Sequence, residues 1–552
     1  MKMPILGFLL VFPILTCFSA TIHVPLEAPT IQAGIDAASE GDIVMISDGV
    51  YTGEGNRDVS LRGKAITVRS ENGAAGCVMN CEGQGRGFYL DENDTANAEI
   101  RDLTITGGLA VEGGAIYCDH AAVTFIGLVV SGNSALSYGG GFHIWEADVS
   151  LKDCSFLDNT SSSFGGGIHS RYSRLGMTGC LFRSNTAYRG GGVYLTGDTR
   201  GIRYCRFESN TAQHIGGGAD ITGNEIDISD CIFSSNTAEI FGGLHIQSNG
   251  SVVMSRCTFA GNSAVHHGGG MGAFLSESFL AVNCLFHNNI ADRHGACMPT
   301  TYDPCHFIHC SFISNRSREN FPVVGDYIRN PLICIGNSIE RDNQPAFVPD
   351  DSRDRYVIFS AVERSLPGIG NIHSDPGLIG GDPFDPRLRP DSPCIDAGRS
   401  GYEIPVDLDG NPRLQGGACD IGAYESSYRP ATPHIYLSMP AHRFFPGDPV
   451  SLTAQIWNPS TETIRNAPVF VILEYLDAYY FMPGGGDISF YTIDCPAGTI
   501  ELGILPEFAW PDIPQSLDQA LWYGAVLDAG LTQMVSNLCV YDFDWRHDDE
   551  PW

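Results

Sequence analysis

One short pattern, Cys-x-Phe-x-x-Asn, returns seven times between residues 154 and 315, each time 25 to 27 residues after the previous copy. Sequence self-similarity at a fixed period of this length is typical of solenoids, in which each repeat forms one coil that stacks on its neighbours. The period therefore constrains the fold more than any single residue does. The seven copies begin at Cys154, Cys180, Cys205, Cys231, Cys257, Cys284 and Cys310.

Apolar and polar residues alternate within each repeat, for example in residues 165–170 and 175–182. This alternation is typical of β-strands, and it places Cys and Phe, two residues apart, on the inward face. Without a helical stretch in the repeat, the pattern predicts a parallel β-solenoid with stacked Phe rings. The Asn three residues after Phe falls at a corner, where its amide can bond along the stack and tolerate a left-handed backbone. The predicted ladder is Asn133, Asn159, Asn185, Asn210, Asn236, Asn262, Asn289 and Asn315.

The chain contains 18 cysteines, and seven of them occupy the same position of the repeat. Stacked coils would hold these seven in parallel about 4.8 Å apart, whereas a disulfide needs converging side chains at a shorter Cβ distance. We therefore expect the seven to be small buried side chains. Three other pairs are better candidates for disulfides, although the sequence leaves the pairing open: Cys77 with Cys81, Cys394 with Cys419, and Cys495 with Cys539.

The first 20 residues have the pattern of a secretory signal peptide. Lys2 precedes an apolar run from Ile5 to Phe18, and small residues follow to Ala20. Cys17 also suggests a lipoprotein processing site, but Thr16 is a poor residue in front of such a cysteine. The run is shorter than the roughly 20 residues of a membrane-spanning helix, and we expect no transmembrane segment. The sequence predicts a secreted, extracellular or cell-surface protein.

The formal net charge of the chain is -32. This charge repels phosphate backbones and anionic lipid surfaces, so we expect no nucleic-acid partner. We expect a monomer.

The remaining patterns predict the ends of the solenoid and a second domain. Residues 30–38 have apolar residues at helical spacing with Thr30 as N-cap, which predicts a short capping helix. We assign residues 21–428 to the solenoid with a C-terminal cap at 375–425, and residues 429–434 to a Pro-containing linker. Residues 435–552 contain alternating segments between turn residues and predict an antiparallel β-sandwich.

Several of these segments resemble known families. The run Thr-Ile-Gln-Ala-Gly-Ile-Asp-Ala-Ala at 30–38, followed by Gly-Asp-Ile-Val at 41–44, resembles the start of right-handed β-helices of the pectin-lyase-like group. The Gly-Gly-Gly-Ile and Phe-x-x-Asn motifs resemble repeats of polymorphic outer-membrane proteins, which are bacterial surface adhesins. Cys394-Ile-Asp-Ala-Gly and Asp420-Ile-Gly-Ala-Tyr-Glu resemble the tail of many secreted bacterial β-helix proteins. The resemblance covers about 400 residues and implies a right-handed parallel β-helix without specifying an activity.

One row of the repeat varies in a way that suggests binding. It follows the first inward residue of a strand, so alternation points it outward, and stacking would align its members along one face. Flat rings and fixed polar groups are suited to sugar rings and hydroxyls, so we predict a polysaccharide or cell-surface glycan as partner. Strand propensity alone can also explain Tyr, His and Thr at such positions. The row is Tyr117, His143, His169, Tyr194, Asp220 and His245, with Trp145, Arg171, Thr196, Thr222 and Gln247 beside it.

Catalysis is the alternative to binding. Glycoside hydrolysis needs two carboxylates on one site, and elimination needs a positioned base. The Asp-Asp pairs of the chain, at 350–351 and 548–549, lie outside the repeats, and Asp220 with His245 is the remaining acid–base candidate. The sequence therefore favours a non-catalytic, adhesin-like protein, with a polysaccharide lyase or hydrolase and a structural envelope component as alternatives.

No cofactor is required by any of these patterns, although two possible metal sites exist. His143 and His169 on adjacent coils offer two imidazoles, but zinc usually takes three or four protein ligands. Asp407 and Asp409 precede Gly410 and offer the hard oxygens that suit calcium. An ordinary Asp-Gly turn explains the same residues.

Overall fold

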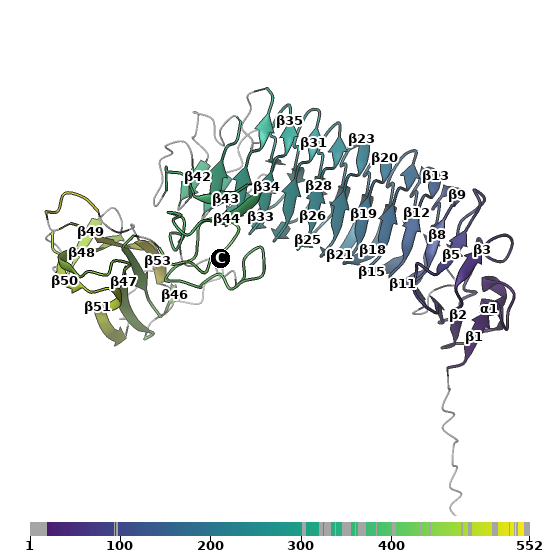
Figure 1. The fold of residues 1–552 in the computed structure, drawn as a ribbon, viewed down its shortest axis with the longest axis horizontal. Coiled ribbons are helices and arrows are strands. Elements are labelled where there is room, and N and C mark those ends of the chain that lie inside the picture. The colour runs from purple at the N-terminus through teal and green to yellow at the C-terminus, as the bar shows by residue number, and fades with distance from the viewer. Residues whose placement is uncertain are drawn as a thin grey trace, which may run out of the picture.

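The computed structural model shows a rod of stacked β-coils with a second, smaller β domain beyond its C-terminal end (Figure 1). Residues 1–18, which make up most of the predicted signal peptide, lie outside the described residues. The Asp-Asp pairs at 350–351 and 548–549 lie outside them as well. The structure describes residues 19–92, 94, 98–300, 305–319, 324, 333–336, 338–344, 355–358, 360–362, 371–381, 384–399, 405–430, 432–440, 443–445, 447–475, 478–483, 488–509, 517–528, 530–534, 536 and 539–545.

Neighbouring coils pair in parallel and build three sheets along the rod. The largest has 21 strands: β1 (Thr21–Val24), β2 (Ile43–Ile46), β4 (Thr67–Ser70), β6 (Phe88–Leu90), β7 (Ala98–Arg101), β10 (Ile116–Asp119), β11 (Ala122–Ile126), β14 (Phe142–Trp145), β15 (Asp148–Lys152), β18 (Ile168–Thr178), β21 (Val193–Arg203), β24 (Ala219–Gly223), β25 (Ile226–Ser229), β28 (Leu244–Ser248), β29 (Val252–Ser255), β32 (Met271–Leu275), β33 (Phe279–Val282), β36 (Cys297–Thr300), β37 (Cys305–Ile308), β40 (Ile333–Gly336) and β42 (Arg355–Ile358).

The second and third sheets consist of shorter strands from the same coils. The 12-stranded sheet carries the Phe of the repeat and comprises β3 (Gly49–Tyr51), β5 (Cys77–Asn80), β8 (Thr104–Thr106), β12 (Val129–Ser131), β16 (Ser155–Leu157), β19 (Leu181–Arg183), β22 (Arg206–Glu208), β26 (Ile232–Ser234), β30 (Thr258–Ala260), β34 (Leu285–His287), β38 (Ser311–Ile313) and β41 (Ile339–Arg341). The 9-stranded sheet follows each Asn and comprises β9 (Leu109–Glu112), β13 (Ser134–Tyr138), β17 (Thr160–Ser161), β20 (Thr186–Arg189), β23 (Thr211–Ile215), β27 (Thr237–Ala238), β31 (Ser263–Ala264), β35 (Ile290–Ala291) and β39 (Arg316–Ser317).

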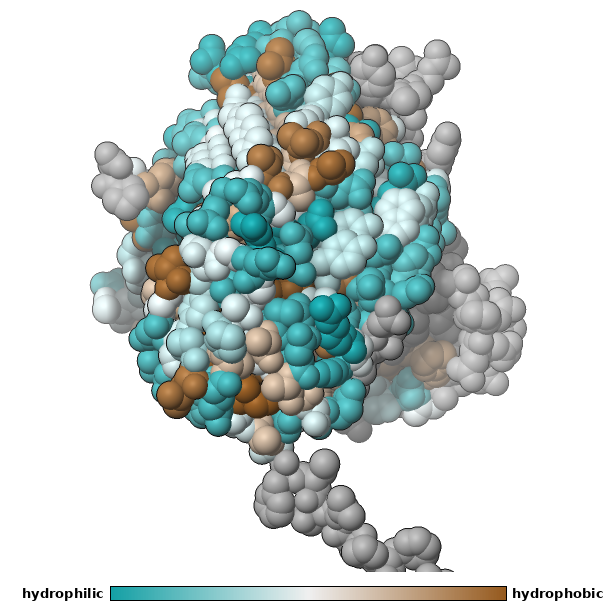
Figure 2. All heavy atoms as spheres, turned by 90° about the vertical axis from the view of Figure 1, so that its right-hand side faces the viewer, coloured by the Kyte–Doolittle hydropathy of each residue, from teal (hydrophilic) through white to brown (hydrophobic). Residues whose placement is uncertain are grey.

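A short helix closes the N-terminal end, as the sequence predicts. Helix α1 (Ile31–Ala37) begins after Thr30, whose hydroxyl accepts a hydrogen bond from the amide of Ala33 at 3.2 Å. Ile31 and Ile35 of this helix are fully buried against the first coil. Viewed from this end of the rod, hydrophilic residues cover most of the surface and hydrophobic residues form small separate groups (Figure 2). The helix therefore ends the core in the way a solenoid requires.

The repeated Phe residues form the predicted stack inside the rod. From Phe156 to Phe312, neighbouring rings in this stack lie 4.6 to 5.0 Å apart and within 9° of parallel. The cysteines of the repeat are buried beside them. The glycine runs let adjacent backbones come this close, since a Cβ on Gly166 would lie 2.3 Å from the carbonyl oxygen of Gly191.

The asparagine ladder is also present, and it extends to Asn343. Each side-chain amide donates to the next Asn Oδ1 and to a main-chain carbonyl; for Asn210 these bonds measure 3.0 Å to Asn236 and 2.9 Å to Phe182. The left-handed corner lies one residue earlier than expected, because Ser184 and Ser209 have positive φ and the Asn after each of them does not. This shift points the Asn side chain inward, where its four hydrogen bonds replace water.

The three predicted disulfides are not formed. Cys77, Cys81, Cys394, Cys495 and Cys539 all have reduced thiols. Cys77 and Cys81 both face the core, four residues apart along an extended segment, and a rise of about 3.3 Å per residue places them roughly 13 Å apart. This distance is well beyond the reach of a disulfide.

The C-terminal part contains a cap and an antiparallel domain. The cap has its own core around Cys394, Ile395 and Ile421 and a two-stranded sheet. Beyond the cap, two larger sheets enclose a separate core and form a β-sandwich. In the part of the chain that the structure describes, no helix is long and apolar enough to cross a membrane. The strands are β43 (Leu378–Gly380), β44 (Asp385–Leu388), β45 (His434–Ser438), β46 (Arg443–Phe444), β47 (Pro449–Asn458), β48 (Ile464–Tyr475), β49 (Ala478–Met482), β50 (Tyr491–Cys495), β51 (Gly498–Ala509), β52 (Leu517–Val526) and β53 (Cys539–Trp545).

Candidate functional site

The predicted row is in register along the largest sheet. Strand pairing aligns Tyr117 with His143, then His169, Tyr194, Asp220 and His245. The rings from Tyr89 to Tyr194 stack face to face, with centroids 4.9 to 5.4 Å apart. In-register coils thus convert one varying position of the sequence into a continuous aromatic column.

Four of the six residues of the predicted row are buried rather than exposed as expected, while Tyr117 and Tyr194 are half-buried. His143 and His169 are each only 3% exposed, Asp220 1% and His245 4%. Tyr138 and Phe164, from the corners before two glycine runs, cover the column: the Tyr138 ring lies 4.8 Å from that of His169, and the Phe164 ring 4.7 Å from that of Tyr194. The alternation of the strand predicts that the row points away from the core of the coil. It could not show that Tyr138 and Phe164 form a second layer over the row.

His143 and His169 bond directly to each other. Their Nδ1 atoms are 3.1 Å apart, so one neutral ring donates and the other accepts. Burial lowers the pKa of His143 to about 4 and that of His169 to about 3. Both rings are therefore neutral at physiological pH. The Glu112 carboxylate lies 4.0 Å from His143 Nε2. Within the described residues, the cluster of three close metal-ligating side chains lies in the C-terminal cap.

A pocket of about 300 Å³ opens where the column meets its covering layer. At its rim the Arg171 guanidinium lies 5.6 Å from the Trp145 ring and 4.7 Å from the Tyr172 ring, and it donates to the Tyr172 hydroxyl at 2.8 Å. The wall combines aromatic faces with carboxylates and imidazoles, which is the composition of a small-molecule site. The lining residues are Glu112, Tyr117, Asp119, His120, Tyr138, His143, Trp145, Phe164, His169, Arg171 and Tyr194.

Asp220 and His245 form a separate, closed cluster further along the rod. Asp220 Oδ1 lies 2.6 Å from His245 Nδ1, and Oδ2 accepts from Arg189 Nε at 2.8 Å. The Phe241 ring stacks on His245 at 5.0 Å, and it occupies the space above Gly272, where a Cβ would lie 2.1 Å from it. Both carboxylate oxygens of Asp220 are thus occupied by neighbouring side chains. The predicted row therefore divides after Tyr194: the residues up to Tyr194 line the pocket, and Asp220 and His245 do not.

The predicted calcium candidates in the cap have different partners. Asp407 is buried and accepts hydrogen bonds from the amides of Asn411 at 2.7 Å and Glu425 at 2.8 Å. Asp409 lies at the surface and pairs with Arg387 at 2.6 Å. One carboxylate therefore fixes a turn, and the other forms a surface ion pair.

Sequence reasoning missed the residues that close the pocket. Tyr138 and Phe164 stand immediately before Gly139 and Gly165 and occupy one register position, so the repeat itself carries the signal that could have identified them. Glu112 lies in β9, whose short sheet was not predicted. Strands of two to five residues show too little alternation to be recognised.

Comparisons with known proteins agree with the fold. Residues 166–330 match a family model described as the right handed beta helix region. Residues 153–171 match the Chlamydia polymorphic membrane protein repeat. No curated protein matches the chain. These matches confirm the predicted right-handed parallel β-helix and the similarity of its repeats to those of polymorphic membrane proteins.

Proposed function

We propose that this chain, which contains a right-handed β-helix region and a repeat similar to that of Chlamydia polymorphic membrane proteins, is a secreted or cell-surface protein that binds a glycan. The glycan would occupy the pocket beside Trp145 and Arg171. The observation that carries the proposal is the combination of aromatic faces and charged groups in one rigid pocket of about 300 Å³. This volume is at the small end of the range for ligand sites and suits a terminal sugar unit.

The chemistry of the wall supports a carbohydrate ligand. The Trp145 ring offers an apolar face to the C–H side of a sugar, and Glu112 and Arg171 offer an acceptor and donors for hydroxyls. The stacked column and its covering layer hold these groups in fixed positions. Little ordering of side chains is therefore needed on binding, which favours affinity.

A glycan array followed by equilibrium binding tests the proposal. We expect Trp145→Ala and Arg171→Ala each to weaken the binding of the selected glycan at least about tenfold, equivalent to about 1.4 kcal/mol. Tyr204→Ala is the matched control, because Tyr204 is 60% exposed and outside the pocket. Equal binding by all four proteins would refute the pocket as the glycan site. Release of reducing ends or unsaturated sugars would instead support the lyase or hydrolase alternative.

A further inference from the structure

Three buried carboxylates meet in the C-terminal cap, far from the pocket. One oxygen from each of Asp396, Asp420 and Glu425 lies within 4.8 Å of the other two. Asp420 is fully buried, Asp396 is 1% exposed and Glu425 is 7% exposed. Like charges at this distance repel strongly away from water, so the cluster needs a positive partner or a proton.

The protein supplies hydrogen bonds to most of these oxygens. The two oxygens of Asp420 accept from the amides of Asp396 and Ser426, both at 2.7 Å. Asp396 Oδ2 accepts from the hydroxyl of Tyr436 at 2.9 Å. Glu425 Oε2 accepts from the amide of Asp420 at 3.0 Å and lies 3.4 Å from Arg413 Nη1.

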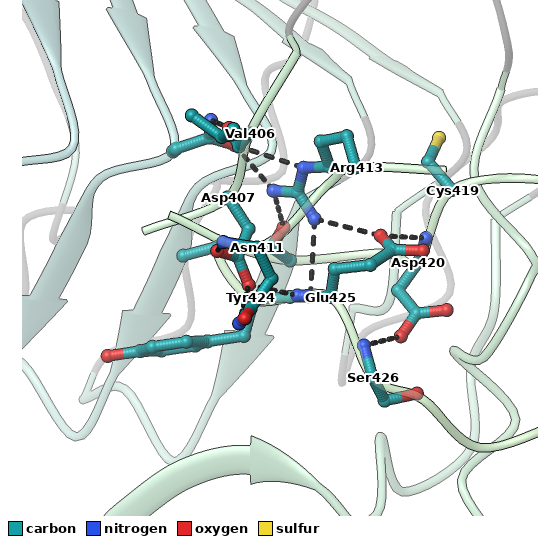
Figure 3. A network of polar contacts seen from close by, with 12 residues as sticks. Val406, Asp407, Asn411, Arg413, Cys419, Asp420, Tyr424, Glu425 and Ser426 are labelled. Carbon is teal, nitrogen blue, oxygen red and sulfur yellow. Dashed lines mark hydrogen bonds and ion pairs between the residues drawn. The ribbon is translucent and has the colours of Figure 1, made fainter. Parts of the chain in front are cut away.

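The remaining oxygen of Glu425 is the exception. Oε1 is buried and has no hydrogen-bond partner among the described residues. Figure 3 shows the Glu425 carboxylate with Arg413 on one side and Asp420 on the other. An unsatisfied buried carboxylate oxygen is costly, and a bound cation or a proton would satisfy it.

The charges around the cluster do not balance. Arg413 is the cation that the described ion pairs place against Glu425, and its guanidinium also donates to the side chain of Asn283 and the carbonyl of Gly422. Asp407 adds a further negative charge behind the Glu425 amide. When all three carboxyl groups are ionised, the one guanidinium leaves two negative charges before Asp407 is counted. A divalent cation would neutralise them.

We propose that Asp396, Asp420 and Glu425 bind a calcium ion that fastens the cap to the β-sandwich. Calcium binds oxygen ligands at 2.3 to 2.6 Å, so two ligands on opposite sides of it are about 4.8 Å apart, and the cluster fits within this limit. An all-oxygen ligand set disfavours zinc and copper, which prefer nitrogen and sulfur. Tyr436 belongs to β45 of the sandwich, so its bond to Asp396 links the ion to the second domain.

Terbium luminescence on the full chain tests this site, because the Tyr436 ring is close enough to sensitise a bound lanthanide. We expect calcium to displace terbium, and Glu425→Gln to weaken terbium binding at least about tenfold. In wild type, saturating calcium should raise the melting temperature of the C-terminal part by roughly 5 °C over chelator-treated protein. Asp409→Asn is the control variant, because it removes a carboxylate that is exposed and already paired.

The outcomes separate calcium from a proton. A wild-type protein with no terbium signal and no calcium-dependent melting shift would overturn the proposal and assign the cluster to a shared proton. Equal loss of terbium binding in Asp409→Asn and Glu425→Gln would overturn the assignment to these three residues. Magnesium should compete weakly, since it demands a stricter octahedral shell.

Discussion

The asparagine ladder and the cap cluster are both rows of buried polar groups, yet they are arranged in opposite ways. In the ladder, each amide gives and receives, so Asn185 donates to Asn210 and Asn210 donates to Asn236 at 3.0 Å. In the cap, one oxygen from each of Asp396, Asp420 and Glu425 lies within 4.8 Å of the other two, and Glu425 Oε1 has no hydrogen-bond partner among the described residues. The first arrangement satisfies all of its own hydrogen bonds, whereas the second leaves an oxygen for a cation or a proton to satisfy.

This difference separates structure from function within one fold. A self-satisfied polar row rigidifies the core and leaves no group available for chemistry. A cluster of carboxylates with too few donors costs free energy unless a cation or a proton joins it. The His143–His169 pair lies between these cases, because it is satisfied only while both rings are neutral.

Breaking one rung of the ladder should produce the largest effect. Asn210→Ala leaves the Asn185 amide and the Phe182 carbonyl unpaired inside the rod. At about 1 to 3 kcal/mol for each buried unsatisfied group, we expect a loss of about 4 kcal/mol of unfolding free energy, measured by denaturant titration. Thr211→Ala is the adjacent control and should change stability by less than about 0.5 kcal/mol, since its side chain is exposed. Similar losses in both variants would contradict the ladder's role.

Acid should open the histidine pair. The folded pKa values of about 4 and about 3 lie below the ordinary value of 6.5, so below pH 6.5 the unfolded chain takes up protons that the folded chain excludes. Stability is therefore retained above pH 6.5 and falls as the pH drops toward 4, by up to roughly 1.4 kcal/mol per pH unit for each ring. Thermal melts from pH 7.5 to 4.5 measure the slope. The variant His143→Phe/His169→Phe should flatten it, and an unchanged slope would rule out the pair as its cause.

The cap should respond to pH in the opposite direction when calcium is absent. Burial raises the pKa of Asp420 to about 6 and that of Glu425 to about 9, above their ordinary values of 3.8 and 4.5. The folded cap thus holds protons that the unfolded chain releases, and its stability is greatest below pH 4 and falls as the pH rises to 9. Between pH 5 and 8 in chelator, we expect stability to fall by up to roughly 1.4 kcal/mol per pH unit for each of the two carboxyl groups, and in calcium we expect a flatter profile. Matching profiles in both buffers would argue against the ion.

The repeat made most of the solenoid predictable, because each coil repeats the chemistry of its neighbour. Phe182 and Asn185 could be placed inside from their spacing alone, and Thr30 could be placed as a helix cap. The burial of His143 could not, since it depends on Tyr138 from a different corner of the coil. The cap cluster could not be predicted either. Asp396, Asp420 and Tyr436 come from segments without a period, and only their tertiary packing brings them together.

The smallest effect should come from the link between the cap and the sandwich, and it should depend on the ion. Tyr436→Phe removes the hydroxyl that donates to Asp396 Oδ2 at 2.9 Å, while the ring stays in place above Gly417. In chelator this removes one hydrogen bond from the buried Asp396 carboxylate, and we expect a loss of about 1 kcal/mol by denaturant titration. With calcium bound, the ion satisfies the Asp396 carboxylate, so the same substitution should cost less than half as much. Equal costs in the two buffers would mean that Asp396 is not a ligand, and would place the cap cluster with the ladder as a purely structural set.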